Sequence, residues 1–246
     1  MAAAMARGWS RAGELSEGVV ACDGGSGRAA QLAAEVGGVA VDGPTEVVDA
    51  CDVVVLATKP TTLPEVAPSI VGRDGLIISV LAGVDIATLE ASLPGQSLIR
   101  AMPNVCVEVC QGVTCWSAGD SADGPERDEV VRLLEGLGSA VEIPEGAMDA
   151  ATAAMSCSVA YFALVAEELS EAASREGLDP ELAREVVAST LAGTGTLLGT
   201  TGARELSDAV ASPGGATEAG LEELAAGGVR EAISSAVAAS ILRMRG

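Results

Sequence analysis

The sequence contains no histidine, one lysine (Lys59) and one asparagine (Asn104). It has six cysteines, but no two of them form a C-x-x-C pair. The chain therefore offers few of the ligands from which zinc sites are built, and we predict no metal centre. Cys106, Cys110 and Cys115 lie close enough in sequence to gather a soft metal. Buried, reduced thiols of a cytoplasmic protein are the preferred interpretation.

Basic residues are also scarce, with 14 against 35 acidic ones and a formal net charge of -21. A chain of this charge is repelled by nucleic acid and by anionic membrane surfaces, so neither is an expected partner. Any anionic ligand must be held by local donors. Arg7 and Arg11 interrupt the N-terminal stretch and no long apolar run follows, so we predict no signal peptide and a cytoplasmic location.

One segment, residues 150–166, carries no charged residue at all, and Glu167 and Glu168 follow it. A membrane span is one interpretation of this segment. A soluble helix buried on all sides is the other, favoured because the run is short and contains hydroxyl side chains. A small helical domain cannot surround such a helix alone, so we predict that a second subunit covers it in an obligate homodimer. The sequence leaves higher oligomers open.

Residues 1–144 alternate short apolar runs with amphipathic helical stretches, which is typical of a doubly wound α/β domain with a parallel sheet. Residues 145–246 contain no strand pattern and are predicted to form an all-α domain. The expected strands are 19–22, 39–41, 53–56, 76–80 and 97–99, with edge strands at 112–116 and 140–143. The expected helices between them are 2–12, 27–36, 45–50, 63–71, 85–92 and 126–134.

Such domains bind ligands at the carboxyl ends of their strands. Lys59, followed by Pro60, places a cation after strand 53–56, and Gly83 permits close approach of a ligand after strand 76–80. Arg100 to Asn104 are expected to follow the end of strand 97–99.

The end of strand 19–22 leaves two cofactor choices open. Asp23 would hydrogen-bond an adenosine ribose, as in NADH binding, whereas Ser26 and Arg28 would hold the 2′-phosphate of NADPH. Asp23 could also be a plain turn residue before two glycines.

A dinucleotide-binding fold begins with a strand and a G-x-G-x-x-G turn before its first helix. Here the chain opens directly on the helical stretch 1–12. The sequence therefore predicts an incomplete Rossmann-like domain that lacks its first strand, which weakens the expectation of tight cofactor binding.

Residues 212–217, with the sequence S-P-G-G-A-T, interrupt the helical half. Proline followed by two glycines cannot continue a helix, and a new helical pattern starts at Thr217. Backbone N–H groups of such a turn and the positive end of the helix dipole favour an anion. A helix–helix turn capped by Thr217 is the alternative.

Five motifs in this order resemble those of the pyrroline-5-carboxylate reductases, and the similarity spans nearly all 246 residues. They are A-x-K-P at 57–60, S-x-x-A-G at 79–83, R-x-M-P-N at 100–104, D-A-x-T-A at 149–153 and S-P-G-G-A-T at 212–217. The resemblance implies a Rossmann domain that binds NADPH or NADH and a helical domain that dimerises. It implies reduction of 1-pyrroline-5-carboxylate to L-proline, the last step of proline biosynthesis, by hydride transfer to the cyclic imine.

The resemblance also assigns roles to residues. Those that line the cofactor are Ala57, Thr58, Lys59, Pro60, Val80, Leu81 and Ala82, with Asn104 as a further candidate and Asp23, Ser26 and Arg28 at the adenosine end. Those around the substrate carboxylate are Ser212, Gly214, Gly215, Ala216 and Thr217, with Glu145 as an additional contact and Thr217 as the catalytic candidate.

The chain departs from the family at Met155–Tyr161, where many members read S-G-S-G-P-A-Y, so helix packing is expected to differ there. Two other functions remain open. One is a different Rossmann-plus-helical oxidoreductase such as a β-hydroxyacid dehydrogenase, although that family uses a lysine in the second domain and no lysine follows Lys59. The other is a non-catalytic, dimerising relative that has lost cofactor binding.

Overall fold

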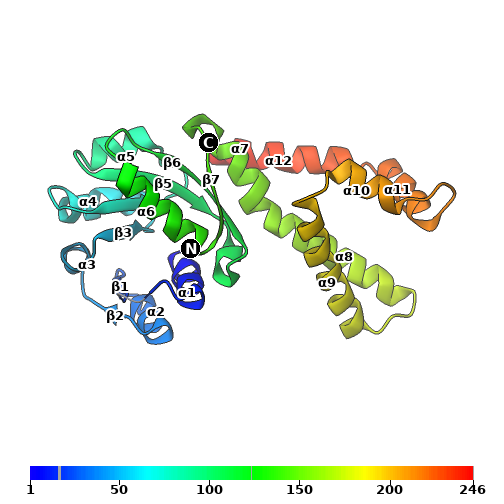
Figure 1. Cartoon of the computed structure of the whole chain (residues 1–246), viewed down its shortest axis with the longest axis horizontal. Coiled ribbons are helices and arrows are strands. Elements are labelled where there is room, and N and C mark those ends of the chain that lie inside the picture. Colours follow the sequence, from blue (N-terminus) through cyan, green and yellow to red (C-terminus); the bar gives the residue numbers. More distant parts are fainter. Residues whose placement is uncertain (16–17, 123, 246) are drawn as a thin grey trace. The chain divides into compact units, whose positions relative to one another are not determined.

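The computed structural model describes residues 1–15, 18–122 and 124–245 (Figure 1). The chain divides into two compact units. The first comprises Met1–Ser156 together with Arg243–Gly246, and the second comprises Cys157–Leu242. Each unit is described below by itself.

The first unit is built on a five-stranded mixed sheet in the order β3 (Val53–Leu56), β4 (Leu76–Ser79), β5 (Ser97–Pro103), β6 (Gly112–Ala118) and β7 (Gly138–Glu142). The pairs β3–β4, β4–β5 and β6–β7 are parallel, and β5–β6 is antiparallel. Two further strands, β1 (Val20–Ala21) and β2 (Val39–Ala40), pair in parallel as a separate sheet.

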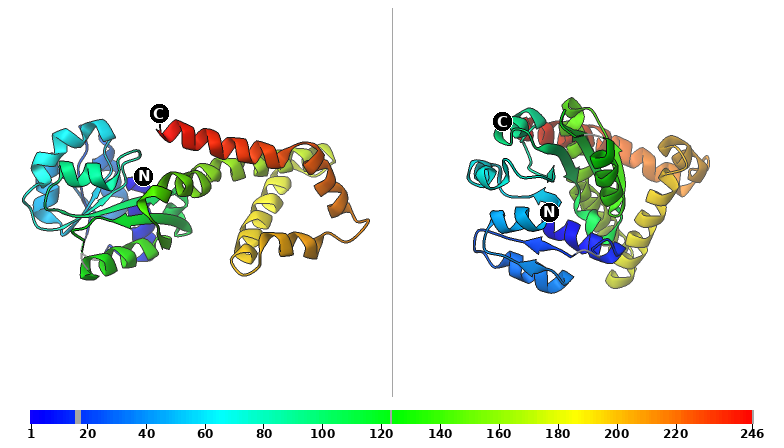
Figure 2. Two further views of the ribbon diagram at one scale, coloured as in Figure 1. Left: turned by 90° about the horizontal axis from the view of Figure 1, so that it is seen from above. Right: turned by 60° about the vertical axis from the view of Figure 1, so that its left-hand side comes forward.

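Helices cover both faces of the five-stranded sheet (Figure 1, Figure 2). Side chains of Ile78 and Ile99 pack on one face against α1 (Ala2–Ala12) and α6 (Gly124–Glu135). Ile77 and Leu98, their chain neighbours, point to the other face. There they meet α3 (Pro44–Ala50), α4 (Leu63–Ile70) and α5 (Ile86–Ser92). Successive strand side chains point to opposite faces, and both kinds are apolar here, so the predicted doubly wound architecture is confirmed.

Two strand predictions need correction. Strand β5 does not end at residue 99 but continues to Pro103, because Arg100–Pro103 pair with Thr114–Ser117 of β6 in antiparallel register. Strand β6 is not an edge strand, since it lies between β5 and β7. Two short 3₁₀ helices were also not predicted, η1 (Pro60–Thr62) and η2 (Val105–Val109).

The two sheets leave the position of a first strand open. Dinucleotide-binding sheets place that strand between the ones that correspond to β1 and β3. Within the residues that the structure describes, β1 pairs only with β2, and β3 pairs only with β4. No strand of the described residues therefore occupies this place.

The first unit ends in a run of helical turns. It consists of η3 (Glu145–Ala147), α7 (Met148–Thr152) and a π-helical segment (Ala153–Cys157), after which α8 (Ser158–Arg175) begins the second unit. The π segment covers part of the stretch in which the sequence departs from the family pattern. A π turn frees backbone carbonyls from their usual partners. The carbonyl of Met155 accepts a hydrogen bond from Asn104 Nδ2 at 2.9 Å.

The helical run Glu145–Arg175 is long and apolar enough to cross a membrane, and 11% of its most apolar window is buried. The predicted burial of this helix on all sides is therefore not provided by the chain itself. Phe162, for example, is 60% exposed. Length and composition alone are weak evidence for a span, and a second subunit would cover the same face.

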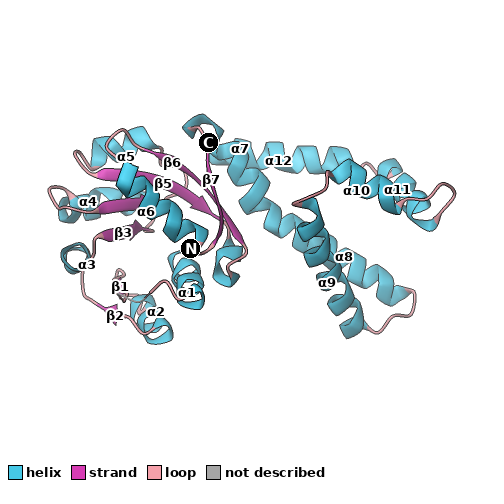
Figure 3. Ribbon diagram, in the orientation of Figure 1, coloured by secondary structure: helices cyan, strands magenta, loops and turns pink. Residues whose placement is uncertain are grey.

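The second unit contains only helices among its described residues (Figure 3). After α8 come α9 (Pro180–Leu198), α10 (Ala203–Val210), α11 (Ala216–Ala226) and α12 (Val229–Arg245). Asp179 caps α9 by accepting hydrogen bonds from Glu181 N and Leu182 N. The Tyr161 hydroxyl lies 2.6 Å from Ser240 Oγ and joins α8 to α12. Few side chains of this unit are buried, and many of its large apolar residues lie on the surface.

Candidate functional site

The carboxyl ends of β3 and β4 bring two predicted cofactor segments together. Leu56 and Ser79 are partners in the parallel register, and Val80 N donates to the carbonyl of Leu56 at 3.0 Å. The segment Ala57–Pro60 follows β3 and is exposed throughout. Because parallel strands end at the same edge, the predicted contacts at 57–60 and 80–82 lie next to each other, as expected for a ligand site of an open α/β sheet.

The loop after β4 offers a ligand its backbone more than its side chains. Leu81 is buried in the core, and its N–H donates to Ser79 Oγ at 3.4 Å. Ala82 and Gly83 are exposed. Gly83 has a φ of 74°, a left-handed conformation that favours glycine, and there is no atom within 4 Å of where its Cβ would be. A flat aromatic ring could approach the backbone here without meeting a side chain.

Asp23 lies at the opposite end of the predicted cofactor site and is surrounded by donors. Its carboxylate accepts hydrogen bonds from Gly25 N at 2.7 Å, Ser26 N at 2.9 Å, Ser26 Oγ at 3.0 Å and Ala29 N at 2.8 Å. These bonds, with that from Ala29 the strongest, lower the pKa of Asp23 to about 2. The carboxylate is ionised at physiological pH, and it occupies the donors that a 2′-phosphate would need. Arg28, beside it, is exposed.

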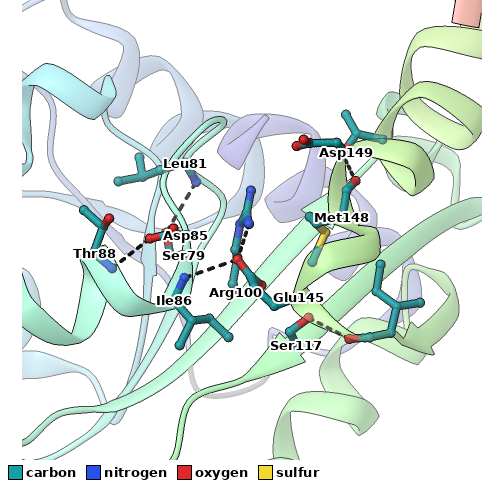
Figure 4. Close-up of polar contacts among 12 residues, drawn as sticks. Ser79, Leu81, Asp85, Ile86, Thr88, Arg100, Ser117, Glu145, Met148 and Asp149 are labelled. Atoms are coloured by element: carbon teal, nitrogen blue, oxygen red, sulfur yellow. Dashed lines mark hydrogen bonds and ion pairs between the residues drawn. The ribbon is translucent and has the colours of Figure 1, made fainter. Parts of the chain in front are cut away.

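Arg100 and Glu145 form an ion pair inside the first unit (Figure 4). Arg100 is on β5 and is only 5% exposed. Glu145 is the first residue of η3, and its Oε1 accepts from both Arg100 Nη1 and Ile86 N. Glu145 was predicted to contact the substrate. Its Oε1 is engaged by the protein and its Oε2 is buried without a hydrogen-bond partner, and contact with the substrate stays a prediction.

The only asparagine also has an internal role. Asn104 is buried, its Oδ1 accepts from Cys106 N at 3.2 Å and Val113 N at 3.3 Å, and its Nδ2 donates to Met155 O. An amide with both ends engaged has little capacity left for a ligand. Asn104 therefore lies outside the cofactor site that we propose, and it fixes η2 against β6 and the π segment.

The S-P-G-G-A-T turn lies in the second unit between α10 and α11. Helix α11 begins at Ala216, one residue before the predicted start, with Gly215 as its N-cap. Gly215 has no side chain to accept from the first-turn N–H groups, so these donors remain available to an anion. Gly214 has a φ of 72°, and its N–H donates to Glu218 Oε2 at 2.6 Å. The turn and the helix start are where the sequence placed them, and anion binding there stays a prediction.

Metal chemistry finds no support in the residues that the structure describes, where no cluster of His, Cys, Asp or Glu could hold an ion. Burial raises the pKa of the Cys22, Cys51 and Cys115 thiols. A raised thiol pKa means an unreactive cysteine.

Sequence reasoning missed the part played by Arg100. The motif R-x-M-P-N was placed beyond the end of strand 97–99, and neither burial nor an acidic partner was predicted for its arginine. A signal was present, because Ala101 and Met102 continue the apolar pattern of the strand past Arg100. An arginine inside a buried strand needs an acidic partner.

Comparisons with known proteins agree with this geometry. The family model described as "Pyrroline-5-carboxylate reductase dimerisation" matches residues 145–246, and "NADP oxidoreductase coenzyme F420-dependent" matches residues 1–83. Pyrroline-5-carboxylate reductase 3 of Xenopus laevis is 40% identical over 203 residues, which are 80% of this chain and 74% of that protein. The chain belongs to the pyrroline-5-carboxylate reductase family.

Other members of this reductase family match almost the full chain. The pyrroline-5-carboxylate reductase of Mycobacterium leprae is 32% identical over 98% of this chain and 91% of its own length. A crystal structure of Plasmodium falciparum pyrroline carboxylate reductase with NADP bound superposes with a TM-score of 0.87 at 25% identity, covering 98% of this chain and 92% of that one. The reductase fold, a Rossmann-like domain followed by a helical domain, is therefore that of this chain.

Proposed function

We propose that this chain reduces 1-pyrroline-5-carboxylate to L-proline with a nicotinamide cofactor. The observation that carries the proposal is membership of the reductase family over nearly the whole chain, with exposed residues in the motifs at 57–60, 79–83 (Ala82 and Gly83) and 212–217. Membership also argues against the β-hydroxyacid dehydrogenases as an alternative.

The cofactor's nicotinamide end fits the exposed edge of the sheet. Ala57, Thr58, Lys59 and Pro60 would hold it from β3, and the backbone of Val80, Leu81 and Ala82 from β4, with open space above Gly83. Lys59 is exposed and supplies a cation for the ribose or phosphate groups. When bound, the reduced cofactor supplies the hydride.

The substrate is an anion, and the turn at 212–217 is suited to hold it. Ser212, Gly214 and Gly215 shape the turn, and the N–H groups of Ala216 and Thr217 point along the start of α11. The Thr217 hydroxyl would hydrogen-bond the carboxylate or the ring nitrogen. A protonated imine carbon is already electrophilic, so alignment and anion binding are the main tasks of the protein, and no histidine is required.

At the adenosine end, the donor set favours NADH over NADPH. The Asp23 carboxylate holds the N–H groups of Gly25 and Ser26 and the hydroxyl of Ser26. A 2′-phosphate would have to displace a permanent negative charge or approach it, whereas a ribose hydroxyl would donate to it. Arg28 is the only cation in this loop that could offset the repulsion.

We further propose that the protein acts as a homodimer in the cytoplasm, without nucleic acid or membrane as partner. The helical unit exposes large apolar side chains on each of its helices, and the family model that matches this region is named for dimerisation. Such a surface is typical of an obligate interface. Sedimentation equilibrium, which tests the dimer, would also detect higher oligomers.

A second candidate, a dimerising relative without catalytic activity, is favoured by one observation. Strands β1 and β3 do not pair with a strand between them in the described part of the chain, and the glycine-rich turn that normally follows such a strand binds the pyrophosphate. This candidate requires that the cofactor does not bind.

The experiment is titration of NADH and of NADPH into the purified chain, followed by addition of pyrroline-5-carboxylate to the mixture that binds. Micromolar binding and loss of the reduced cofactor's absorbance, with formation of proline, support the reductase. Absence of binding for both cofactors would favour the non-catalytic relative. Binding of a cofactor without turnover would be consistent with the assigned fold but would refute the assigned substrate.

A further inference from the structure

A buried arginine lies at the level where two strands of the sheet end. Arg100 is the register partner of Ser79, the last residue of β4, and Ser79 is the partner of Leu56, the last residue of β3. Because β5 continues to Pro103, Arg100 brings its guanidinium to the edge from which both predicted nicotinamide segments leave the sheet. Figure 4 shows this side chain beside Glu145 and close to Ile86.

Glu145 connects Arg100 to a third element. Its Oε1 accepts from Arg100 Nη1 and, at 3.3 Å, from Ile86 N, the first residue of α5. Asp85, the N-cap of α5, accepts from Thr88 N at 2.8 Å. Hydrogen bonds from Thr88 lower the pKa of Asp85, and the charge of Arg100 adds to the effect. One carboxylate oxygen thus ties β5, the start of α5 and η3 together.

The chain between β4 and α5 is held at both ends as a result. At its beginning, Leu81 is buried in the core and its N–H donates to Ser79 Oγ. At its end, Ile86 is held by Glu145. The exposed backbone of Ala82 and Gly83 lies between these two points. Val84, which follows Gly83, is also buried in the core, and the ion pair fixes the start of α5 two residues further on.

The Arg100–Glu145 pair is not expected to add much to the free energy of unfolding. Arg100 Nε and Glu145 Oε2 are both buried without a hydrogen-bond partner. Buried ion pairs with unmet hydrogen bonds are often no more stabilising than apolar residues of similar size, although loss of one partner is costly. The planar guanidinium fixes the direction of its hydrogen bonds, which an apolar pair cannot do. Orientation of the neighbouring segments is therefore the better reason for this ion pair.

We infer that Arg100 and Glu145 are positioning residues for the reduction: together they hold the loop Val80–Asp85 where it meets the nicotinamide end of the cofactor. The inference rests on the proposed function. In this inference Glu145 does not contact the substrate directly. It acts on cofactor binding by holding Ile86 and, through it, the loop Val80–Asp85.

The test compares two ligands by calorimetry on the full chain. In Glu145→Gln, the dissociation constant for NADH should rise about tenfold and kcat should fall, while that for ADP-ribose, which lacks the nicotinamide, should stay within about twofold of the wild-type value. The matched control is Glu142→Gln. Glu142 is the last residue of β7 and forms an exposed ion pair with Arg127 of α6, which the substitution removes. The control should bind both ligands as the wild type does.

A second variant guards against misfolding. If Glu145→Gln does not fold because Arg100 is left unpaired, the double variant Arg100→Met/Glu145→Gln removes the buried charge, and it should fold and show the same selective loss of NADH binding. Arg100→Lys, which keeps the charge and loses the fork, should show an intermediate loss.

Two results would overturn the inference. One is wild-type NADH affinity in Glu145→Gln or in the double variant. The other is an equal loss of NADH and ADP-ribose, since a purely structural role would affect both. If the wild-type chain binds neither NADH nor NADPH, the proposed function fails instead.

Discussion

At the scale of single residues, Asp23 is the basis of our proposal for the two cofactor choices that the sequence left open. The sequence nominated this loop, because an acid after a strand and a serine and arginine behind it can be recognised by residue type; that it binds the cofactor stays a prediction. It could not decide between them, since the outcome depends on where the loop donors point. Here the N–H groups of Gly25, Ser26 and Ala29 point at the carboxylate.

The first prediction concerns this carboxylate. Asp23→Ser should raise kcat/KM for NADPH relative to NADH by about tenfold, because one like-charge contact of ~1.4 kcal/mol is removed and donors for a phosphate are freed. Steady-state kinetics with both cofactors measures the ratio. Asp42→Ser, which alters an exposed acid after β2, is the control and should leave the ratio unchanged. A wild-type chain that already prefers NADPH would contradict the assignment.

The second prediction concerns Thr217. Loss of a hydrogen bond to a charged substrate costs about 1.5–3 kcal/mol, so Thr217→Ala should lower kcat/KM for pyrroline-5-carboxylate by about 10- to 100-fold. The residue is in the first turn of a helix, so the melting temperature should change little. Thr196→Ala is the control, because its hydroxyl bonds only to Ala192 O within α9. Full activity of Thr217→Ala would show that the hydroxyl has no part in the site.

At the scale of elements, the local pattern of apolar residues predicted most helices and strands of the first unit. The features that it missed depend on pairing between strands that are distant in sequence. Apolar runs identified β3 and β4 because both are buried between helices. The extension of β5 to Pro103 depends on its antiparallel pairing with β6, which no local pattern reports. The apolar residues Ala101 and Met102 signal that Arg100 lies in a buried strand, but its acidic partner Glu145 comes from a distant segment that no local pattern identifies.

The contact between α1 and η2 gives an element-scale prediction. A Cβ on Gly8 would lie 2.2 Å from Val107 O and 2.6 Å from Leu137 Cδ2, so the helix approaches this backbone closely only because residue 8 is glycine. Gly8→Ala should lower the free energy of unfolding by about 1–3 kcal/mol through overpacking.

Urea denaturation measures this change. Gly24→Ala is the control, because there is no atom within 4 Å of where its Cβ would be, and it should stay within about 0.5 kcal/mol of the wild type. Equal stability of the Gly8 and Gly24 variants would mean that α1 is free to move away from η2.

At the scale of the whole molecule, the uncharged stretch 150–166 was predicted to be covered by a second subunit, and the chain itself buries little of this helical run. Its apolar side chains are exposed, as are those of the helices after it. The net charge of -21 disfavours an anionic surface as the cover. A second copy of the chain is the partner we propose.

Sedimentation equilibrium should therefore find a dimer. Phe162→Glu places a charge on an exposed apolar side chain of α8, and it should shift the protein toward monomer at micromolar concentration. Val71→Glu, at an exposed apolar position of the first unit, should remain dimeric. A monomeric wild type, or a Phe162→Glu protein that dimerises as tightly as the wild type, would contradict this interface.

The central claim is hydride transfer to a cyclic imine, and isotope transfer tests it most directly. The chain is incubated with pyrroline-5-carboxylate and nicotinamide cofactor carrying deuterium at the transferable position of C4, and the proline formed is analysed by mass spectrometry and NMR. We predict one deuterium at Cδ of L-proline, the carbon of the former imine bond. Unlabelled proline, or no proline although the cofactor binds, would contradict the account.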